Sequence, residues 1–257
     1  MPESWEPAQY LRFRAAREEP FRDLVSLVRA APGMRVADLG CGTGDLTAQL
    51  HRQIQARETI GVDSSPAMLA KAEPGQGLRF VLQDLAESLP DAPFDLLFSN
   101  AALHWLPDHG SLLAALTKAL APGGQVAVQI PANDDHVSHQ TAFELAQEHE
   151  FKRHLGGYVR RPPLPDPAQY ASWLHHLGYV EQHVRLQVYA PLLGGRDEVI
   201  EWVKGALLTD YQKRLPPFVW EAFLRRYREL LLPRLPDERP FLYTYPRILF
   251  WGRLAQS

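Results

Sequence analysis

An acidic residue followed by three glycines at every second position ends an apolar run early in the chain. The segment reads Val36-Ala37-Asp38-Leu39-Gly40-Cys41-Gly42-Thr43-Gly44. Glycines let a backbone approach a ligand closely, and a helix that begins after Gly44 would point its free N–H groups into the same space. The segment therefore predicts a nucleotide-type cofactor site at the end of a first parallel strand.

The spacing of these glycines argues against a dinucleotide cofactor and hence against a dehydrogenase. Dinucleotide sites have the pattern G-x-G-x-x-G, in which a helix dipole faces a pyrophosphate. Here the glycines alternate, and Asp38 lies two residues before the first of them, where it would repel pyrophosphate. Such an acid suits a cofactor that carries an ammonium or sulfonium group.

Two later acidic residues also follow predicted strands. Asp63 ends the apolar segment 60–63, about 20 residues after Gly44, near the distance at which a second-strand carboxylate accepts ribose hydroxyls. Asp84 follows the predicted strand 78–82. A single acid in this position is commonly a turn or helix cap. Three of them, at the ends of successive strands, would line one crevice at the carboxyl edge of a sheet.

Together these segments resemble the class I S-adenosylmethionine-dependent methyltransferases. The matching segments are Asp38–Gly44, Asp63–Met68, Gln83–Leu85 and Ser99–Trp105. The resemblance implies S-adenosyl-L-methionine as cofactor and S-adenosylhomocysteine as product. The implied contacts are Asp38, Gly40, Cys41, Gly42, Gly44, Asn100 and Ala101 at the methionine part, Asp63 at the ribose, and Ser64, Met68, Asp84 and Leu85 at the adenine.

Segments spread over nearly the whole chain are similar to the trans-aconitate methyltransferase family, which esterifies a carboxylate of a small tricarboxylic acid. They are Trp5–Phe13, Ser99–Asp108, Trp202–Gly205 and Tyr245–Ile248. One departure follows Gly205, where the chain reads Ala-Leu-Leu-Thr-Asp and many relatives have a Gly-Leu-Arg-Pro-like run. The chain lacks that arginine.

A sulfonium methyl transferred in line to a carboxylate needs no general base, because the carboxylate is already ionised at pH 7. The protein must align the two groups, which can supply roughly 7–11 kcal/mol of a barrier. The acid needs cationic and hydroxyl partners. Arg17 is the first candidate, since it follows Tyr10 by seven residues and a continuous helix would place both on the same face. Related methyltransferases use such a pair over the cofactor's own carboxylate, so either anion remains its possible target.

Other candidates for contact with the acid lie after the fourth strand and on the last. Tyr245 and Arg247 belong to the predicted final strand, where surface positions are the alternative. His104 and Trp105 follow the fourth strand beside the predicted methyl site. His104 could instead hydrogen-bond a loop, and Trp105 could instead fill the core. Cys41 is interpreted as a small spacer rather than a nucleophile, and the ten histidines show no metal-ligand pattern.

Composition favours a soluble enzyme. The 257 residues are 46% hydrophobic, enough for one large α/β domain, and the net charge of −3 gives no attraction to nucleic acid or anionic membranes. A single cysteine favours a reducing compartment, the amino end is polar rather than signal-like, and no apolar run approaches the ~20 residues needed to span a bilayer. We expect a cytoplasmic protein, consistent with a monomer, although the oligomeric state stays open.

Strands alternating with helices predict a doubly wound, parallel, Rossmann-like sheet of about seven strands. The expected strands are 35–39, 60–63, 78–82, 94–99, 125–130, 181–189 and 242–251. Residues 1–257 are expected to form one methyltransferase domain. By resemblance, residues 1–30 and the helical insertions 133–165 and 191–238 would form a cap that excludes water.

Two other functions remain open on this sequence. One is methyl transfer to another small-molecule carboxylate or hydroxyl, and the other is cofactor binding without catalysis. Methylation of nucleic-acid adenine is disfavoured, because Asn100 is followed by Ala-Ala-Leu rather than by a Pro-Pro-aromatic run.

Overall fold

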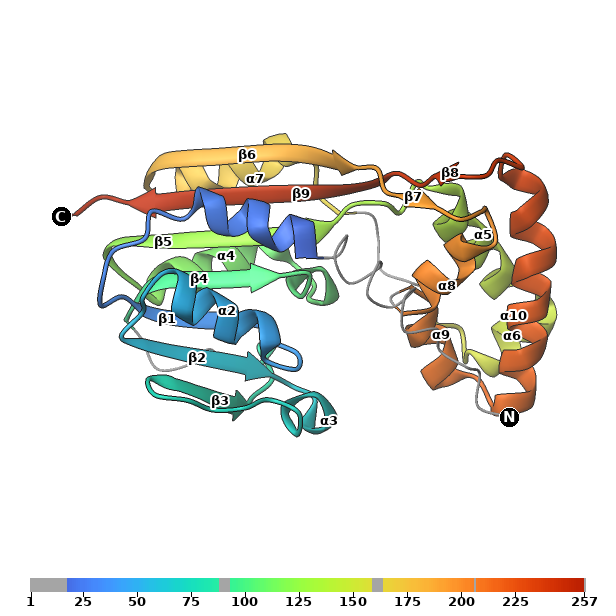
Figure 1. The fold of residues 1–257 in the computed structure, drawn as a ribbon, viewed down its shortest axis with the longest axis horizontal. Helices are drawn as coiled ribbons and strands as arrows, with labels where there is room; N and C mark the ends of the chain where they lie inside the picture. The colour runs from blue at the N-terminus through green and yellow to red at the C-terminus, as the bar shows by residue number, and fades with distance from the viewer. Residues whose placement is uncertain (1–17, 88–92, 159–163, 206, 257) are drawn as a thin grey trace. The chain divides into compact units, whose positions relative to one another are not determined.

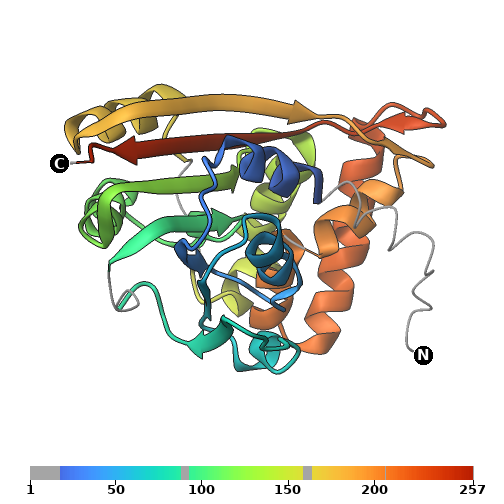
Figure 2. The same cartoon turned by 60° about the vertical axis from the view of Figure 1, so that its left-hand side comes forward.

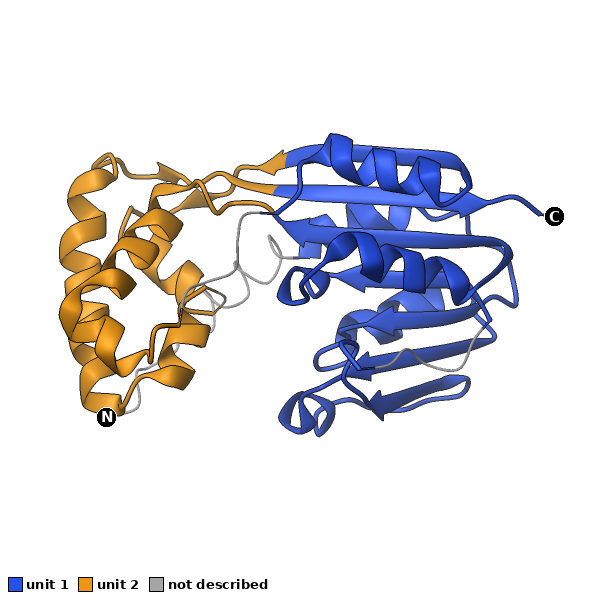
Figure 3. Ribbon diagram, turned by 180° about the vertical axis from the view of Figure 1, so that it is seen from behind, with its two compact units in different colours: residues 1–131, 164–187, 247–257 blue, residues 132–163, 188–246 orange. Residues whose placement is uncertain are grey.

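The computed structural model describes residues 18–87, 93–158, 164–205 and 207–256. The chain divides into two compact units (Figure 3). Unit 1 takes Met1–Pro131, Leu164–Gln187 and Arg247–Ser257, and unit 2 takes Ala132–Pro163 and Val188–Pro246. The predicted insertions 133–165 and 191–238 fall almost entirely in unit 2, and their role as a cap stays a prediction.

A seven-stranded sheet forms the centre of unit 1 (Figure 1). Its strand order is β3-β2-β1-β4-β5-β9-β6. The bounds are β1 Arg35–Leu39, β2 Glu58–Asp63, β3 Leu78–Leu82, β4 Phe94–Asn100, β5 Leu120–Pro131, β6 Tyr179–Tyr189 and β9 Tyr245–Leu254. The predicted α/β class and seven strands are confirmed, and the first and third strands begin and end where predicted.

The expectation of a wholly parallel sheet is wrong for β9. Strands β1 to β5 pair in parallel, but β9 runs antiparallel to β5, with Arg247 opposite Pro131. The reason is topological. After β6 the chain leaves unit 1 at Gln187 and re-enters it at Arg247, which lies opposite Pro131 at the end of β5, so the returning strand runs back along β5 in the opposite direction.

Helices cover both faces of this sheet (Figures 1 and 2). The helical segment 18–27 and α2 (Asp45–Gln53) lie on one face, and α4 (His109–Lys118) and α7 (Pro167–His176) lie on the other. Two short pieces, α3 (Pro66–Leu69) and η1 (Leu103–Trp105), follow β2 and β4. Ser65 caps α3, as predicted, by accepting a hydrogen bond from Met68 N.

The core on the first face joins the helical segment 18–27 to the sheet. Phe21 and Phe98 meet edge to face, with ring centroids 5.7 Å apart. The buried cluster around them comprises Phe21, Leu24, Val25, Met34, Val36, Leu50, Ile54, Leu96, Phe98, Ala127, Leu249 and Trp251. Every third or fourth residue of segment 18–27 points inward, as an amphipathic helix requires.

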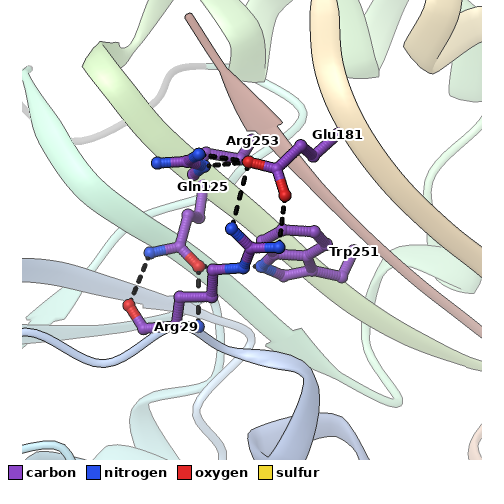
Figure 4. A network of polar contacts seen from close by, with 5 residues as sticks. All are labelled: Arg29, Gln125, Glu181, Trp251 and Arg253. Atoms are coloured by element: carbon purple, nitrogen blue, oxygen red, sulfur yellow. Dashed lines mark hydrogen bonds and ion pairs between the residues drawn. The ribbon is translucent and has the colours of Figure 1, made fainter. Parts of the chain in front are cut away.

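A buried glutamine fastens the end of segment 18–27 to the sheet (Figure 4). Gln125 Oε1 accepts hydrogen bonds from Arg29 N (2.9 Å) and Trp251 Nε1 (2.8 Å), while Gln125 Nε2 donates to Arg29 O (2.9 Å). Nearer the surface, Glu181 pairs with both Arg29 and Arg253. The amide therefore satisfies the buried indole N–H of Trp251 and both part-buried backbone groups of Arg29.

Unit 2 is mainly helical. Its elements are α5 Val137–Gln147, α6 His149–His154, α8 Glu198–Lys204, α9 Leu207–Arg214, α10 Pro217–Leu231, η2 Leu232–Arg234 and the short strand pair β7 Leu192–Leu193 and β8 Phe241–Leu242. Tyr189, Trp202, Tyr243 and Tyr245 pack together, with the Trp202 and Tyr245 rings 5.1 Å apart. No helix in the described part of the chain is both long and apolar enough to cross a bilayer.

Replacing Gln125 by leucine is expected to lower the free energy of unfolding by about 2–3 kcal/mol, because Trp251 Nε1 and the two Arg29 backbone groups lose their partner. Denaturant unfolding measures this. The comparison is Glu181→Gln, which weakens only surface ion pairs and should cost much less. Equal losses in the two variants would contradict the importance of the buried amide.

Candidate active site

The glycine turn after β1 is anchored on the end of β2 and packs against the chain that follows β4. Gly40 N and Cys41 N donate to Val62 O at 2.8 and 2.9 Å. Gly40 has φ +81°, and a Cβ built there would lie 2.1 Å from Ala102 Cβ. Only glycine fits, so this position is required for the packing of the turn rather than for ligand approach.

Asp63 holds the turn from the neighbouring strand. Its Oδ2 accepts from Gly42 N at 2.9 Å, and its Oδ1 accepts from Ser65 N at 2.8 Å. A Cβ on Gly42 would meet no atom within 4 Å, so the backbone of the turn faces open space at this point. Each carboxylate oxygen keeps a second lone pair with which it could accept a ligand hydroxyl.

Asp38 is a buried carboxyl, 4% exposed, at the end of β1. Thr47 Oγ1, on α2, donates to Asp38 Oδ2 at 2.6 Å. Burial raises the pKa of Asp38 to about 6, against the lowering effect of the Thr47 hydrogen bond, and the charge of Asp63 raises it further. A ligand cation would offset both effects that raise this pKa.

The Cys41 thiol belongs to the same turn but is not activated. Burial raises its pKa far above the ordinary range, and the nearby charges of Asp38 and Asp63 raise it further. The thiol stays protonated at neutral pH, and a protonated thiol is a poor nucleophile. This agrees with its interpretation as a small spacer.

The residues predicted to meet adenine lie after β2 and β3. Asp84 Oδ1 accepts a hydrogen bond from Ala86 N at 2.8 Å, so the Asp84 side chain closes a turn with the backbone two residues later. Leu85 lines a cleft of about 450 Å³ together with residues around the start of α4. Ser64 is exposed, and Met68, on α3, is 46% exposed. Both are accessible to a ligand.

Asn100 ends β4 at the same edge of the sheet, and Ala101 follows it. Ala101 has φ +57°, an unusual backbone for alanine, and its N–H donates to Gln129 O on β5 at 2.9 Å. Asn100 Oδ1 is buried and has no hydrogen-bond partner among the described residues. A buried acceptor of this kind is costly unless something else satisfies it.

The residues predicted to contact the acid are spread over several elements. His104 and Trp105 lie in η1, with ring centroids 4.7 Å apart, and Trp105 is 46% exposed. Arg247 is half-buried on β9 in unit 1, whereas Tyr245 is fully buried in the aromatic cluster of unit 2. Tyr10 and Arg17 lie outside the described residues, so their roles stay predictions.

The structure thus brings Asp38, the glycine turn, Asp63 and Asn100 together at the carboxyl ends of three adjacent strands. A buried carboxyl and an unsatisfied amide oxygen fit a cationic group, and the open backbone at Gly42 leaves room for it. No cluster of three or more His, Cys, Asp or Glu that could hold a metal ion occurs within the described ranges.

Two polar residues at this edge were not singled out from the sequence. Thr47 bonds Asp38 from α2, and Gln129 is a buried glutamine near the end of β5. The available signal for Gln129 was a polar side chain inside an otherwise apolar strand, which is rare without a partner or a purpose.

Comparison with known proteins agrees with this geometry. A family model described as a methyltransferase domain matches residues 36–124, from β1 into the start of β5. Among solved structures, the YcgJ protein of Bacillus subtilis superposes with a TM-score of 0.58 at 19% identity, covering 93% of this chain and 100% of that one. A phosphoethanolamine N-methyltransferase of Haemonchus contortus gives 0.56 at 18% identity, covering 93% of this chain and 53% of that one. At these identities the likeness shows the fold alone.

Relatives in sequence are much more similar. The trans-aconitate 2-methyltransferase of Deinococcus radiodurans is 45% identical over 255 residues, covering 96% of this chain and 97% of that protein. The protein of the same name from Streptomyces avermitilis is 38% identical, covering 95% of each chain. Because such relatives match from end to end, the chain belongs to the trans-aconitate 2-methyltransferase family.

Proposed function

We propose that this protein binds S-adenosyl-L-methionine and transfers its methyl group to a carboxylate of trans-aconitate or a closely similar small acid. The cofactor assignment rests on one observation. The buried carboxyl of Asp38 and the unsatisfied Oδ1 of Asn100 lie at the same edge of the sheet. Both are acceptors that a ligand ammonium can satisfy. The acid is proposed from the names of the relatives.

When bound, the cofactor supplies an electrophilic methyl on a sulfonium. Asp38 and Asn100 would hold the ammonium of its amino-acid end, and Asp63 would accept from the ribose hydroxyls. Ser64, Met68, Asp84 and Leu85 would enclose the adenine. Gly42 would let the backbone approach, because nothing lies within 4 Å of its Cβ position.

The reaction needs little proton chemistry from the protein. A carboxylate acceptor is ionised at neutral pH, and the residues proposed to touch it have only to orient and desolvate it. Arg247 is the described cation proposed to hold a second carboxylate of the acid, and Arg17 is proposed for the same task or for the cofactor's carboxylate. His104 and Trp105 are proposed to bound the acceptor beside the methyl group. We also propose that the protein works in the cytoplasm.

The protein is expected to form a methyl ester of trans-aconitate when incubated with labelled S-adenosyl-L-methionine and a panel of di- and tricarboxylic acids. Mass spectrometry of the products identifies the acid and the group that is methylated. Label found only on an amine or a phenol, with no ester from any acid, would overturn the proposed acceptor but leave the cofactor assignment standing.

Asp63→Ala is expected to weaken S-adenosylhomocysteine binding by about 100-fold, because the ribose loses an ionised acceptor and the turn loses its anchor at Gly42 N. Titration calorimetry measures the Kd. Asp45→Ala removes an exposed acid in the first turn of α2 and should leave the Kd within about twofold. A near-normal Kd in Asp63→Ala would mean that the ribose lies elsewhere.

The Kd for S-adenosylhomocysteine is expected to rise about tenfold per pH unit as the pH falls below about 6, because the ammonium needs Asp38 ionised. Since the folded pKa of Asp38 is above its usual value of 3.8, the stability of the free protein depends on pH in the opposite sense. The contribution of Asp38 to stability is fully present below about pH 4 and is lost as the pH rises through about 6. Calorimetry and unfolding measured across this range test the two slopes.

Asp38→Asn supplies the control for both measurements. The variant should bind more weakly at neutral pH and lose the steep dependence of Kd on pH. An unchanged dependence in the variant would assign the titration to another group.

A further inference from the structure

Three polar side chains lie in a row on one face of the sheet, at its carboxyl edge. Asp38, Asn100 and Gln129 each follow, by two residues, a core residue of the same cluster, namely Val36, Phe98 and Ala127 respectively. Residues two apart in a strand share a face, and Asn100 is the register partner of Gln129. The three side chains therefore point to the side covered by α2 and the helical segment 18–27.

Gln129 is the member of this row without an assigned role. It is 1% exposed, and its Nε2 is buried with no hydrogen-bond partner in the described part of the chain. A buried amide donor left unsatisfied destabilises a fold, so native structures retain few of them.

The same strand contains a glutamine with the opposite character. Gln125 lies four residues earlier on the same face, and its amide makes three hydrogen bonds to Arg29 and Trp251. The amide of Gln125, which has a structural role, thus has hydrogen-bond partners within the fold. At Gln129 the partner has to come from outside the described chain.

The chemistry of the row indicates what that partner is. Asp38 and Asn100 Oδ1 are acceptors suited to a cation, whereas Gln129 Nε2 is a donor suited to an anion. On the far side of Gln129, Arg247 lies opposite Pro131 on the same face, two residues beyond the Gln129–Leu249 pair. The row therefore passes from anionic to cationic groups along the sheet edge, with Gln129 on the side that favours a carboxylate.

We propose that Gln129 Nε2 donates a hydrogen bond to a carboxylate of the bound ligand. The proposal rests on the proposed function. It has two possible sources of the carboxylate, the acid that is methylated and the amino-acid end of the cofactor. Asn100 and Gln129 are neighbours on β4 and β5. Asn100 would then accept from a cationic group and Gln129 would donate to an anionic one, so the ligand would bind in one orientation only.

The test compares two variants of nearly the same volume as the native residue. Gln129→Leu removes the donor, and Gln129→Glu places a negative charge where a carboxylate is expected. Gln182→Glu, on an exposed position of β6, makes the same change of charge away from the site. Three constants are measured for each: the Kd for S-adenosylhomocysteine, the Kd for 5′-methylthioadenosine, which lacks the amino-acid end, and the KM for trans-aconitate.

If the cofactor supplies the carboxylate, the Kd for S-adenosylhomocysteine rises about tenfold in Gln129→Leu and further in Gln129→Glu, while that for 5′-methylthioadenosine stays within about twofold. If the acid supplies it, only the KM for the acid rises. Unfolding of the ligand-free Gln129→Leu protein should occur at the same or a higher denaturant concentration, because an unsatisfied donor has been removed.

Equal weakening of both nucleoside ligands, a less stable ligand-free Gln129→Leu protein, or no change above twofold in any constant would overturn the assignment of Gln129. Native protein that binds S-adenosylhomocysteine in those experiments would leave the proposed function intact. Native protein that binds no S-adenosylhomocysteine would overturn both.

Discussion

The two oxygens of the Asp63 carboxylate fix the geometry on which the candidate site depends. One accepts from Gly42 N in the turn after β1, and the other accepts from Ser65 N, where α3 begins. This side chain therefore links the turns that follow two adjacent strands, in addition to the hydrogen bonds from Gly40 N and Cys41 N to Val62 O. Because Gly40 also packs against Ala102, which follows β4, hydrogen bonds and packing join the ends of all three strands.

The sequence predicted the parallel half of the fold well, because its signals are local. Apolar runs that end in an acid or a glycine turn marked β1, β2 and β3, and proline and serine marked the start of α3. The antiparallel direction of β9 could not be predicted this way, since it depends on where the chain re-enters unit 1 after a long excursion. The residue pattern within β9 does not indicate whether the strand pairs in parallel or antiparallel.

The candidate site divides in the same manner. Asp38, Gly42 and Asp63 follow from motif spacing and Asn100 from the resemblance to class I methyltransferases, and the fold brings all four to one edge of the sheet. Thr47 and Gln129 could not be predicted from motif spacing, because their roles depend on the packing of separate elements. Thr47 donates to Asp38 from α2, and the amide nitrogen of Gln129 on β5 is buried with no partner in the described part of the chain. Tyr245 reads as a polar candidate in sequence, yet the fold buries it fully among aromatic rings of unit 2.

Strands β6 and β9 are neighbours that run in opposite directions (Figure 1), and segment 188–246 of unit 2 joins them. Two such strands need only a tight turn between them. That segment is in effect an elaborated hairpin loop, and lengthening a loop adds little entropic cost once its ends are fixed. The register of β6 against β9 therefore does not depend on the length of this connection, and the sheet can carry a whole helical unit there at little entropic cost.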